Sequence, residues 1–545
     1  TDVKDNLLNV PALGVNETIK GTNTVNYFSS KIDQIWNKNF RSSLRANIGS
    51  VEIERQGGGL DGGASFPSSA NTQQRNSVLL ALKNSYSFGK LSAETNIQYS
   101  RFNWDYANPL NANDPQVTVL GTNDETLAIL GHPGFYFNAI ENTVQVQQKF
   151  KYYLDNHTLK FGLNYIRGDH ELFGGGNPNG NYTVKLTQPQ IDALNAGGFG
   201  SALSINDIPS DVSVLNYNVE LRPAAFGTHQ DIYSAYLEDL WSVTDKLNIT
   251  VGLRYDYDHL SKGANTEGDY NNLAPRFNLN YKLTNNSSLR GGYGIAYDKI
   301  NYAVYSDALQ QNTTSADYKT QLQELINLGI LPANTNLNAV TFDGNISANL
   351  AVVTYLEGPT SDQLQGQREG AFSNERRILN PNGYDNPYSH QFSVGYQLQV
   401  DENKLFYVDV VHNRGENLFR LRNLNAASEY TVDPNNVIVR TPAEADATRP
   451  IPIVNGTATI DGQTVTGVAR NVIMSETEGK SRYYAMSLNY QKSRGTDVYS
   501  YRLNYTLSSL KNDTDDINFR AMDGNNYGNE WGPSLNDRTH NINGI

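Results

Sequence analysis

The sequence predicts an all-β protein that crosses a membrane as an antiparallel up-and-down β-barrel with long extracellular loops. Three observations predict this fold. Segments of about ten residues alternate apolar and polar side chains. Short turns join these segments in pairs, and much longer connections join one pair to the next. Tyrosine and tryptophan collect near the segment ends. Together these features are typical of barrels in the outer membrane of Gram-negative bacteria.

The segment 247–258 shows the alternation most clearly. Its odd positions, Leu247 to Tyr257, are apolar or aromatic, and its even positions, Asn248 to Asp258, are polar, charged or glycine. The same alternation recurs at 157–165, 276–283, 392–400 and 499–507. Because successive side chains of a strand point to opposite faces, we expect one face to meet lipid and the other to line the barrel.

The turns and the long connections set the expected topology. Turn residues stand between paired strands at 37–39, 88–90, 155–156, 244–246, 284–288, 401–403 and 493–496. The long connections run roughly over 54–73, 104–135, 172–229, 260–273, 300–385, 415–480 and 511–537. The pattern gives about fourteen strands, and the chain from Thr539 onward could begin another. Two apolar periodicities within the loops predict short helices at 187–196 and 316–328.

The aromatic residues predict two girdles at the membrane interfaces. Trp36 and Trp241 lie beside tight turns. The other girdle comprises tyrosines near the far ends of their strands, namely Tyr99, Tyr165, Tyr255, Tyr257 and Tyr297. The ten steps from Leu247 to Tyr257, at ~3.4 Å each and tilted by ~45°, span about 24 Å, close to the ~25 Å apolar band of such barrels.

Composition and motifs exclude several functions. The 545 residues include 43 basic and 56 acidic ones, a net charge of −13, so a nucleic-acid partner is not expected. There is no cysteine, and the sequence contains none of the common catalytic motifs, so we expect no enzyme and no cofactor. The alternative of a soluble β-sandwich would not need aromatics at strand ends. A propeller would show a repeat of ~40–50 residues, which the sequence lacks.

Two sets of charged residues are candidate sites. The first lies on the inward phase of the strands and could line a substrate path, or its members could pair with one another: Arg254, Asp256, Asp258, Arg276, Arg290, Asp298 and Arg502. The second, Asp513, Asp515 and Asp516, offers oxygen ligands for calcium in a long loop. Its spacing fits no EF-hand, so a solvated loop is the favoured interpretation.

Several stretches resemble the barrel of TonB-dependent outer-membrane transporters, and most closely the Oar-like subgroup. The stretches that carry the resemblance are 241–258, 273–299 and 380–425, with 26–49, 157–170 and 481–513 matching in the same order. The resemblance implies an outer-membrane transport or receptor protein for a bulky solute such as a glycan, peptide or chelate. It also implies contact with outer-membrane lipid, with TonB and with a plug domain.

A complete member of that family would have about 22 strands. By this comparison, 1–25 is expected to be a lead-in segment or loop, and 26–545 a partial barrel with 14–15 of those strands. A signal peptide, a regulatory-like β domain, a TonB box, a plug and closing strands are not recognised in the sequence. Two alternatives remain open. One is a passive porin-like or fatty-acid-transporter-like channel, and the other is an adhesive or structural surface protein with surface or periplasmic partners.

Overall fold

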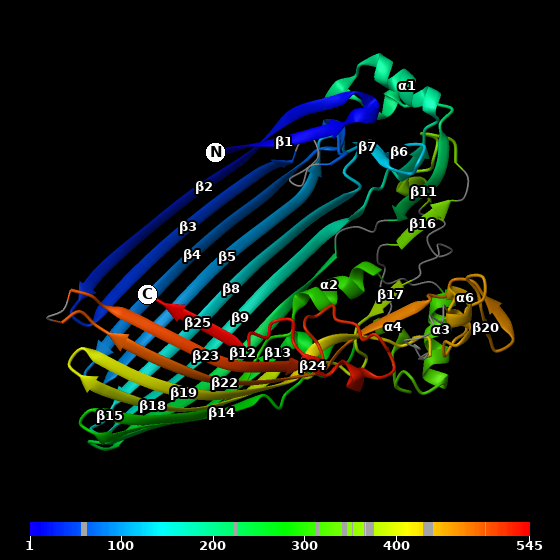
Figure 1. Ribbon diagram of the computed structural model, residues 1–545. Coiled ribbons are helices and arrows are strands. Elements are labelled where there is room, and N and C mark those ends of the chain that lie inside the picture. Colours follow the sequence, from blue (N-terminus) through cyan, green and yellow to red (C-terminus); the bar gives the residue numbers. More distant parts are fainter. Residues whose placement is uncertain are drawn as a thin grey trace.

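The computed structural model describes residues 1–55, 63–221, 226–311, 316–340, 346–350, 353–364, 366, 375–428, 440–495 and 498–545. Within them one 18-stranded sheet dominates, accompanied by a five-stranded and a two-stranded sheet (Figure 1). No helix in the described part of the chain is long and apolar enough to cross a bilayer.

The large sheet is built from long antiparallel strands that follow one another in chain order. They are β2 (Val15–Asn37), β3 (Phe40–Arg55), β4 (Asn71–Phe88), β5 (Leu91–Pro109), β8 (Phe135–Tyr153), β9 (His157–Gly176), β12 (Phe226–Thr244), β13 (Leu247–Asp258), β14 (Leu273–Thr284), β15 (Ser287–Tyr297), β18 (Tyr388–Asp401), β19 (Lys404–Asn423), β22 (Asn471–Lys492), β23 (Tyr501–Asn512) and β25 (His540–Gly544). Each pairs antiparallel with the next. The predicted up-and-down fold is confirmed, including the further strand after Thr539.

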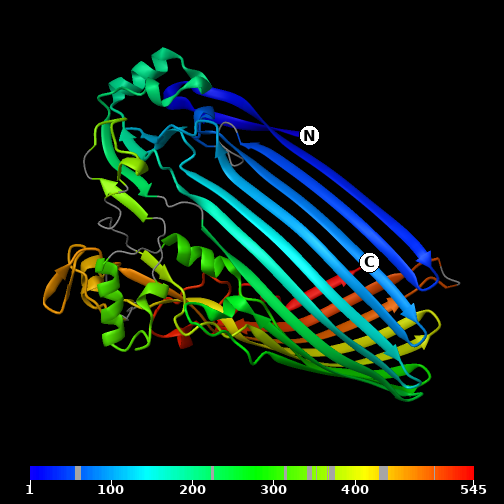
Figure 2. The same cartoon turned by 180° about the vertical axis from the view of Figure 1, so that it is seen from behind.

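The hairpin turns gather at one end of the sheet and the long connections at the other (Figures 1 and 2). The predicted turns separate the expected pairs, from β2/β3 to β22/β23; residue 496 of the last turn lies outside the described residues. In both views the sheet curves so that the last strands face the first. All turns therefore point to one side of the membrane.

The strands are longer than the expected ten residues. They reach 23 residues in β2 and 22 in β22, against 12 in β13 and 11 in β15. Backbone hydrogen bonds between strands do not depend on side-chain polarity, so pairing continues beyond the apolar band. The prediction of strand length was wrong because alternation marks only the part of a strand that faces lipid.

The outward face of the sheet is apolar and uncovered. Leu237 and Leu253 lie opposite each other on β12 and β13 and are 58% and 50% exposed. The same outward face extends across β4 and β5, where Leu82 lies opposite Ile97. An apolar surface this large, left open by the protein, suits contact with lipid.

Two lobes stand on the loop end. Lobe one contains the sheet β16 (Ile346–Leu350), β11 (Ser213–Leu221), β10 (Asn181–Lys185), β6 (Gln116–Leu120) and β7 (Thr126–Gly131), with helix α1 (Gln188–Gly197). Its core includes Val117, Leu130 and Tyr217, which are fully buried. The segment 1–25, expected as a lead-in or loop, forms β1 (Asp2–Val10), the turn Pro11–Leu13 and the start of β2, and joins the same core through Leu8.

Lobe two contains α3 (Ala316–Asn327), β20 (Ala458–Ile460) and β21 (Gln463–Val465), with a core around Tyr318 and Leu322. The helices predicted at 187–196 and 316–328 are thus confirmed as α1 and α3. The remaining loop elements are η2 (Pro67–Ser69), η3 (Gly200–Ala202), η4 (Ile205–Asp207), η5 (His259–Lys262), α2 (Tyr302–Gln311), α4 (Leu337–Val340), α5 (Ser361–Leu364), β17 (Glu375–Ile378), α6 (Pro442–Ala447), η7 (Tyr527–Glu530) and β24 (Gly532–Pro533).

Candidate functional site: the mouth pocket and the inner wall

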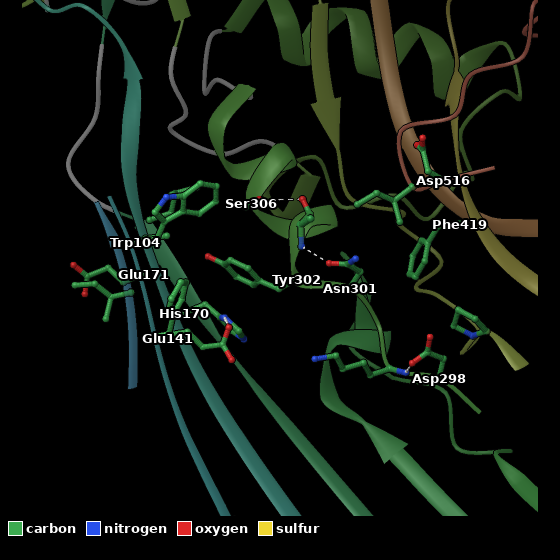
Figure 3. Close-up of a pocket in the computed structure, with 18 of the residues that line it drawn as sticks. Trp104, Glu141, His170, Glu171, Asp298, Asn301, Tyr302, Ser306, Phe419 and Asp516 are labelled. Atoms are coloured by element: carbon green, nitrogen blue, oxygen red, sulfur yellow. Dashed lines mark hydrogen bonds and ion pairs between the residues drawn. The ribbon is translucent and has the colours of Figure 1, made fainter. Parts of the chain in front are cut away.

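A cavity of about 760 Å³ lies where the strands meet the loops. We call it the mouth pocket. Its lining includes Phe102, Trp104, Phe137, Glu141, His170, Asp298, Lys299, Tyr302, Phe419, Asp515 and Asp516. Figure 3 shows Tyr302 beside His170, with Phe419 and Asp516 on the far side. A cavity of this size falls in the range of small-molecule sites, about 300–1,000 Å³.

Strand register brings the wall of the mouth pocket together. Phe102 on β5 lies opposite Glu141 on β8, which in turn lies opposite His170 on β9. Two residues further along β5, Trp104 continues the same face, because side chains two apart in a strand share a face. Tyr302, at the start of α2, stacks on His170 with ring centroids 4.1 Å apart. The loop after β15 thus folds back onto the wall.

The mouth pocket is rich in carboxylates and aromatic rings. Burial lowers the pKa of His170 below its usual range, although the Glu141 carboxylate 3.6 Å away opposes this shift. The imidazole is therefore neutral at neutral pH and supplies no positive charge to the half-exposed Glu141 side chain beside it. Asp298 and Asp516 are also exposed carboxylates, whereas Lys299 is the cation of the lining.

Two donors beside the mouth pocket are buried. The Trp104 Nε1 and Tyr302 Oη atoms have no hydrogen-bond partner within the described residues. Burial raises the pKa of Tyr302 to about 12, so its hydroxyl stays protonated. Buried donors without a partner cost free energy, about 1–3 kcal/mol each. Such a site can stack rings and exchange hydrogen bonds with a ligand, which is binding chemistry.

The inward face of the sheet below the mouth pocket, which we call the inner wall, carries five of the predicted charges: Arg254, Asp256, Arg276, Arg290 and Arg502. Arg254 and Asp256 pair with each other at 2.6 Å. Arg290 on β15 forms an ion pair at 2.7 Å with Asp409 on β19. Sequence reasoning did not single out Asp409. Arg502 donates to the side chain of Gln491 at 3.2 Å.

Arg276 borders two hollows on the inner wall, one of about 240 Å³ and one of about 510 Å³. Gly252 lines the first hollow and Gly294 the second, whereas the Asn278 side chain already occupies the position that a side chain on Gly292 would take. Pairing places Gly252, Arg276 and Gly294 in one row across β13, β14 and β15.

Asp258 and Asp298 lie above the inner wall, at the base of the loops. Asp258 is buried rather than facing open space; its carboxylate accepts hydrogen bonds from Gln230 Nε2 at 2.7 Å and from the Ile300 backbone at 2.8 Å. Burial raises its pKa despite these bonds. Its role is to fasten the loop after β15 to the end of β13. Asp298 opens onto the mouth pocket and accepts from the Lys299 backbone.

The tryptophans lie beside hairpin turns as expected, but Tyr99 and Tyr165 lie in the middle of their strands, because β5 and β9 continue to Pro109 and Gly176. Trp36 stacks on Phe40 and Trp241 on His157, both beside hairpin turns. At the other level, the contacts are Tyr165 with Tyr233, Tyr257 with Tyr270, and Tyr297 with Tyr388. Tyr99, Tyr165 and Tyr255 each lie eight residues from the start of their strands, at 91, 157 and 247. Their contact with lipid headgroups stays a prediction.

The loop aspartates do not converge. Asp513 accepts from the Lys480 backbone, Asp515 from Asn512 and Ser534, and Asp516 from the Asn518 backbone. Burial alone would raise the pKa of Asp515, but these donors lower it. Across the part of the chain that the structure describes, no three His, Asp or Glu side chains form a group that could hold a metal ion.

Sequence reasoning missed most of the mouth pocket. Phe102, Glu141 and His170 lie on the inward phase of their strands, beyond the stretches that alternate most clearly. The signal that could have found them is that the alternation continues past the tyrosine level. Tyr302 and Phe419 belong to connections expected only as loops, and nothing local in the sequence brings them to the pocket that β9 lines.

Comparison with known proteins identifies relatives of the fold. The profile of the outer membrane beta barrel domain family matches residues 6–267 and 260–544. The solved structure of the outer membrane transporter YddB from Escherichia coli aligns with 92% of this chain and 50% of that one, at 12% identity and a TM-score of 0.56. A probable TonB-dependent siderophore receptor, PirA from Acinetobacter baumannii, is 39% identical over 77 residues, which are 14% of this chain and 9% of PirA. The chain thus spans about half the length of the YddB structure.

Proposed function

The chain belongs to the outer membrane β-barrel domain family, and from this premise we propose that it is the barrel of a TonB-dependent transporter or receptor of the Oar-like subgroup. It lies in the outer membrane, surrounded by lipid. Its cargo is a bulky solute such as a glycan, peptide or chelate. The asparagine, glutamine, serine and tyrosine side chains of the interior suit a polar organic solute better than a bare metal ion.

This proposal depends on one observation: the mouth pocket at the loop end of the sheet lies above an inner wall that contains unfilled hollows. Gly252 and Gly294 leave space on the wall that their own strands cannot fill. In the complete protein a plug domain occupies that space, and about 22 strands close the barrel. The YddB and PirA relatives support this reading through fold and partial sequence similarity, respectively.

The mechanism follows from the placement of the two regions. The lobes and the mouth pocket capture the solute outside the cell through ring stacking and many individually weak hydrogen bonds. TonB, pulling from the periplasm, rearranges the plug and opens a path along the inner wall. No covalent step and no cofactor take part, so the specificity of the protein is a matter of binding alone.

The test is leakage of the complete protein reconstituted in liposomes. We expect no swelling in small sugars, because the plug fills the lumen, and rapid swelling after removal of the plug. Free permeation of small sugars through the intact protein would instead establish the passive channel. If the protein does not leak and deletion of TonB does not change the uptake of the solute by cells, the adhesive or structural alternative would be favoured.

A further inference from the structure

The inner wall carries a surplus of positive charge. Its carboxylates between the turns and the mouth pocket are already paired with cations: Asp33 with Lys31, Glu94 with Lys83 and Lys149, Glu238 with Lys160, Asp256 with Arg254, and Asp409 with Arg290. Further cations on the same face form no ion pair within the described residues, namely Arg41, Arg45, Lys151, Arg276, Lys282 and Arg502. All six are exposed. The chain as a whole carries a net charge of −13, so this face has the opposite sign.

Two pairs of like charges meet directly on this wall. Lys31 on β2 lies opposite Arg45 on β3, and Lys151 on β8 lies opposite Lys160 on β9. Like charges directly opposite each other destabilise a sheet. Lys160 has Glu238 at 2.9 Å and Lys31 has Asp33 at 2.7 Å, but Arg45 and Lys151 have no such carboxylate in the described chain. Negative charge from outside the chain would remove this repulsion.

We propose that the inner wall is a docking surface for an acidic face of the domain that fills the lumen. The inference rests on the proposed function, which supplies that domain, and adds the sign of the charge by which wall and domain recognise each other. Aspartate and glutamate of the incoming face would pair with Arg41, Arg45 and Lys151 on one side of the barrel and with Arg276 on the other. Arginine favours such contacts because its guanidinium binds a carboxylate through two parallel hydrogen bonds.

A protein face fits this distribution better than a small anion does. The surplus cations lie on β3, β8, β14 and β23, which run round the curved sheet (Figure 1). One small anion can contact only neighbouring strands, about 4.8 Å apart. The glycine hollows beside Arg276 also need volume to fill them, which side chains of a docked domain supply. A permanent occupant removes the like-charge repulsion at all times.

The experiment measures ion conductance of the complete protein in planar bilayers as KCl is raised. Salt screens exposed ion pairs, so it weakens a docked acidic face. The triple variant Arg41→Gln/Arg45→Gln/Lys151→Gln is expected to raise the open fraction about tenfold at a given salt concentration, since three exposed pairs are lost. The matched control, Lys38→Gln/Lys90→Gln/Lys246→Gln, removes the same charge at the hairpin turns and should behave like the unmodified protein.

Two further measurements keep the inference falsifiable. Arg41→Lys/Arg45→Lys keeps the charge and should restore closure, which separates an electrostatic effect from misfolding. The open state should prefer chloride to potassium, and the triple variant, which keeps Arg276, Lys282 and Arg502, should show a weaker preference. Equal opening of the triple variant and the control, or an open state without anion preference, would overturn the docking inference. As long as the unmodified protein does not leak at low salt, the transporter proposal would still stand.

The small-anion alternative has its own outcome. If free citrate blocks the open unmodified protein but not the triple variant, and salt does not open the closed protein, the wall binds a small anion and the docking inference is wrong. Conduction by the unmodified protein at low salt would contradict the transporter proposal itself, whatever the variants do.

Discussion

An arginine at the centre of the lipid-facing surface should cost the barrel much of its stability, and Leu253→Arg is the sharpest test. Leu253 lies on β13 midway between the Trp241 level and the Tyr257 level, opposite Leu237, and is 50% exposed on the outward face. An arginine at the bilayer midplane of a barrel costs about 2–4 kcal/mol. Since 1.4 kcal/mol is a factor of ten, the folded-to-unfolded ratio should fall by about 30- to 1,000-fold.

The neighbouring positions explain the choice of Leu253 and its control. Val251, one position nearer the turn on the same face, lies opposite Asp239, so an arginine there could form an ion pair that offsets the cost. Thr250 points inward, opposite Leu240 and Asn278, and Thr250→Arg should lose less than about 1 kcal/mol because water is available inside.

The assay is urea-dependent folding of the complete protein into lipid vesicles, read from the gel mobility of unheated samples. Equal losses for Leu253→Arg and Thr250→Arg would refute the assignment of faces. A loss in Thr250→Arg alone would show that the two faces are exchanged. Either outcome would also remove the basis for the inner wall, because the same alternation places its charges.

Three smaller predictions concern the inner wall and the loops. A methyl group at Gly395 would overlap the ion pair that crosses its strand, so Gly395→Ala should destabilise the barrel by about 0.5–1 kcal/mol in urea titration, whereas Gly291→Ala, with ordinary contacts, should not. Because the pKa of His170 is lowered in the folded protein, the neutral ring contributes stability above pH ~6.5, and this contribution is lost as the pH falls. The melting temperature should therefore drop on acidification, and the drop should be smaller in His170→Gln. The buried Tyr217 hydroxyl donates to the Pro359 carbonyl at 2.6 Å, so Tyr217→Phe should cost lobe one about 1–3 kcal/mol, seen as faster hydrogen exchange there without a change in the barrel.

The barrel could be predicted from sequence because lipid imposes a simple rule on each strand. A charge facing lipid is costly, so positions such as Leu247 to Tyr257 must alternate, and the alternation reveals both the strand and its faces. Turn chemistry then fixes where each strand ends, as at 244–246. Each of these signals is local, so one sequence suffices to read them.

The mouth pocket could not be predicted because its geometry depends on distant contacts. The Tyr302 ring stacks on His170, and two residues earlier in the chain the buried Asp258 carboxylate accepts a hydrogen bond from the Ile300 backbone, which anchors this loop to β13. Lobe one likewise combines β6, β10, β11 and β16, which come from three separate connections. Loop pairing of this kind follows no periodicity, since it depends on where the barrel strands place the loop ends.

Net charge is a poor guide to the partners of a barrel, because alternation sorts charge by face. The value of −13 describes the whole chain, yet the wall around Arg45 and Lys151 is positive and the mouth pocket around Glu141 is negative. A molecule approaching from outside meets the carboxylates first, whereas a domain inside the barrel meets the cations. The field is strong only within about a Debye length, ~8 Å at physiological salt, so each partner senses the charge of the face it touches. Partner chemistry should therefore be argued one face at a time, with the strand register as the guide to which charges share a face.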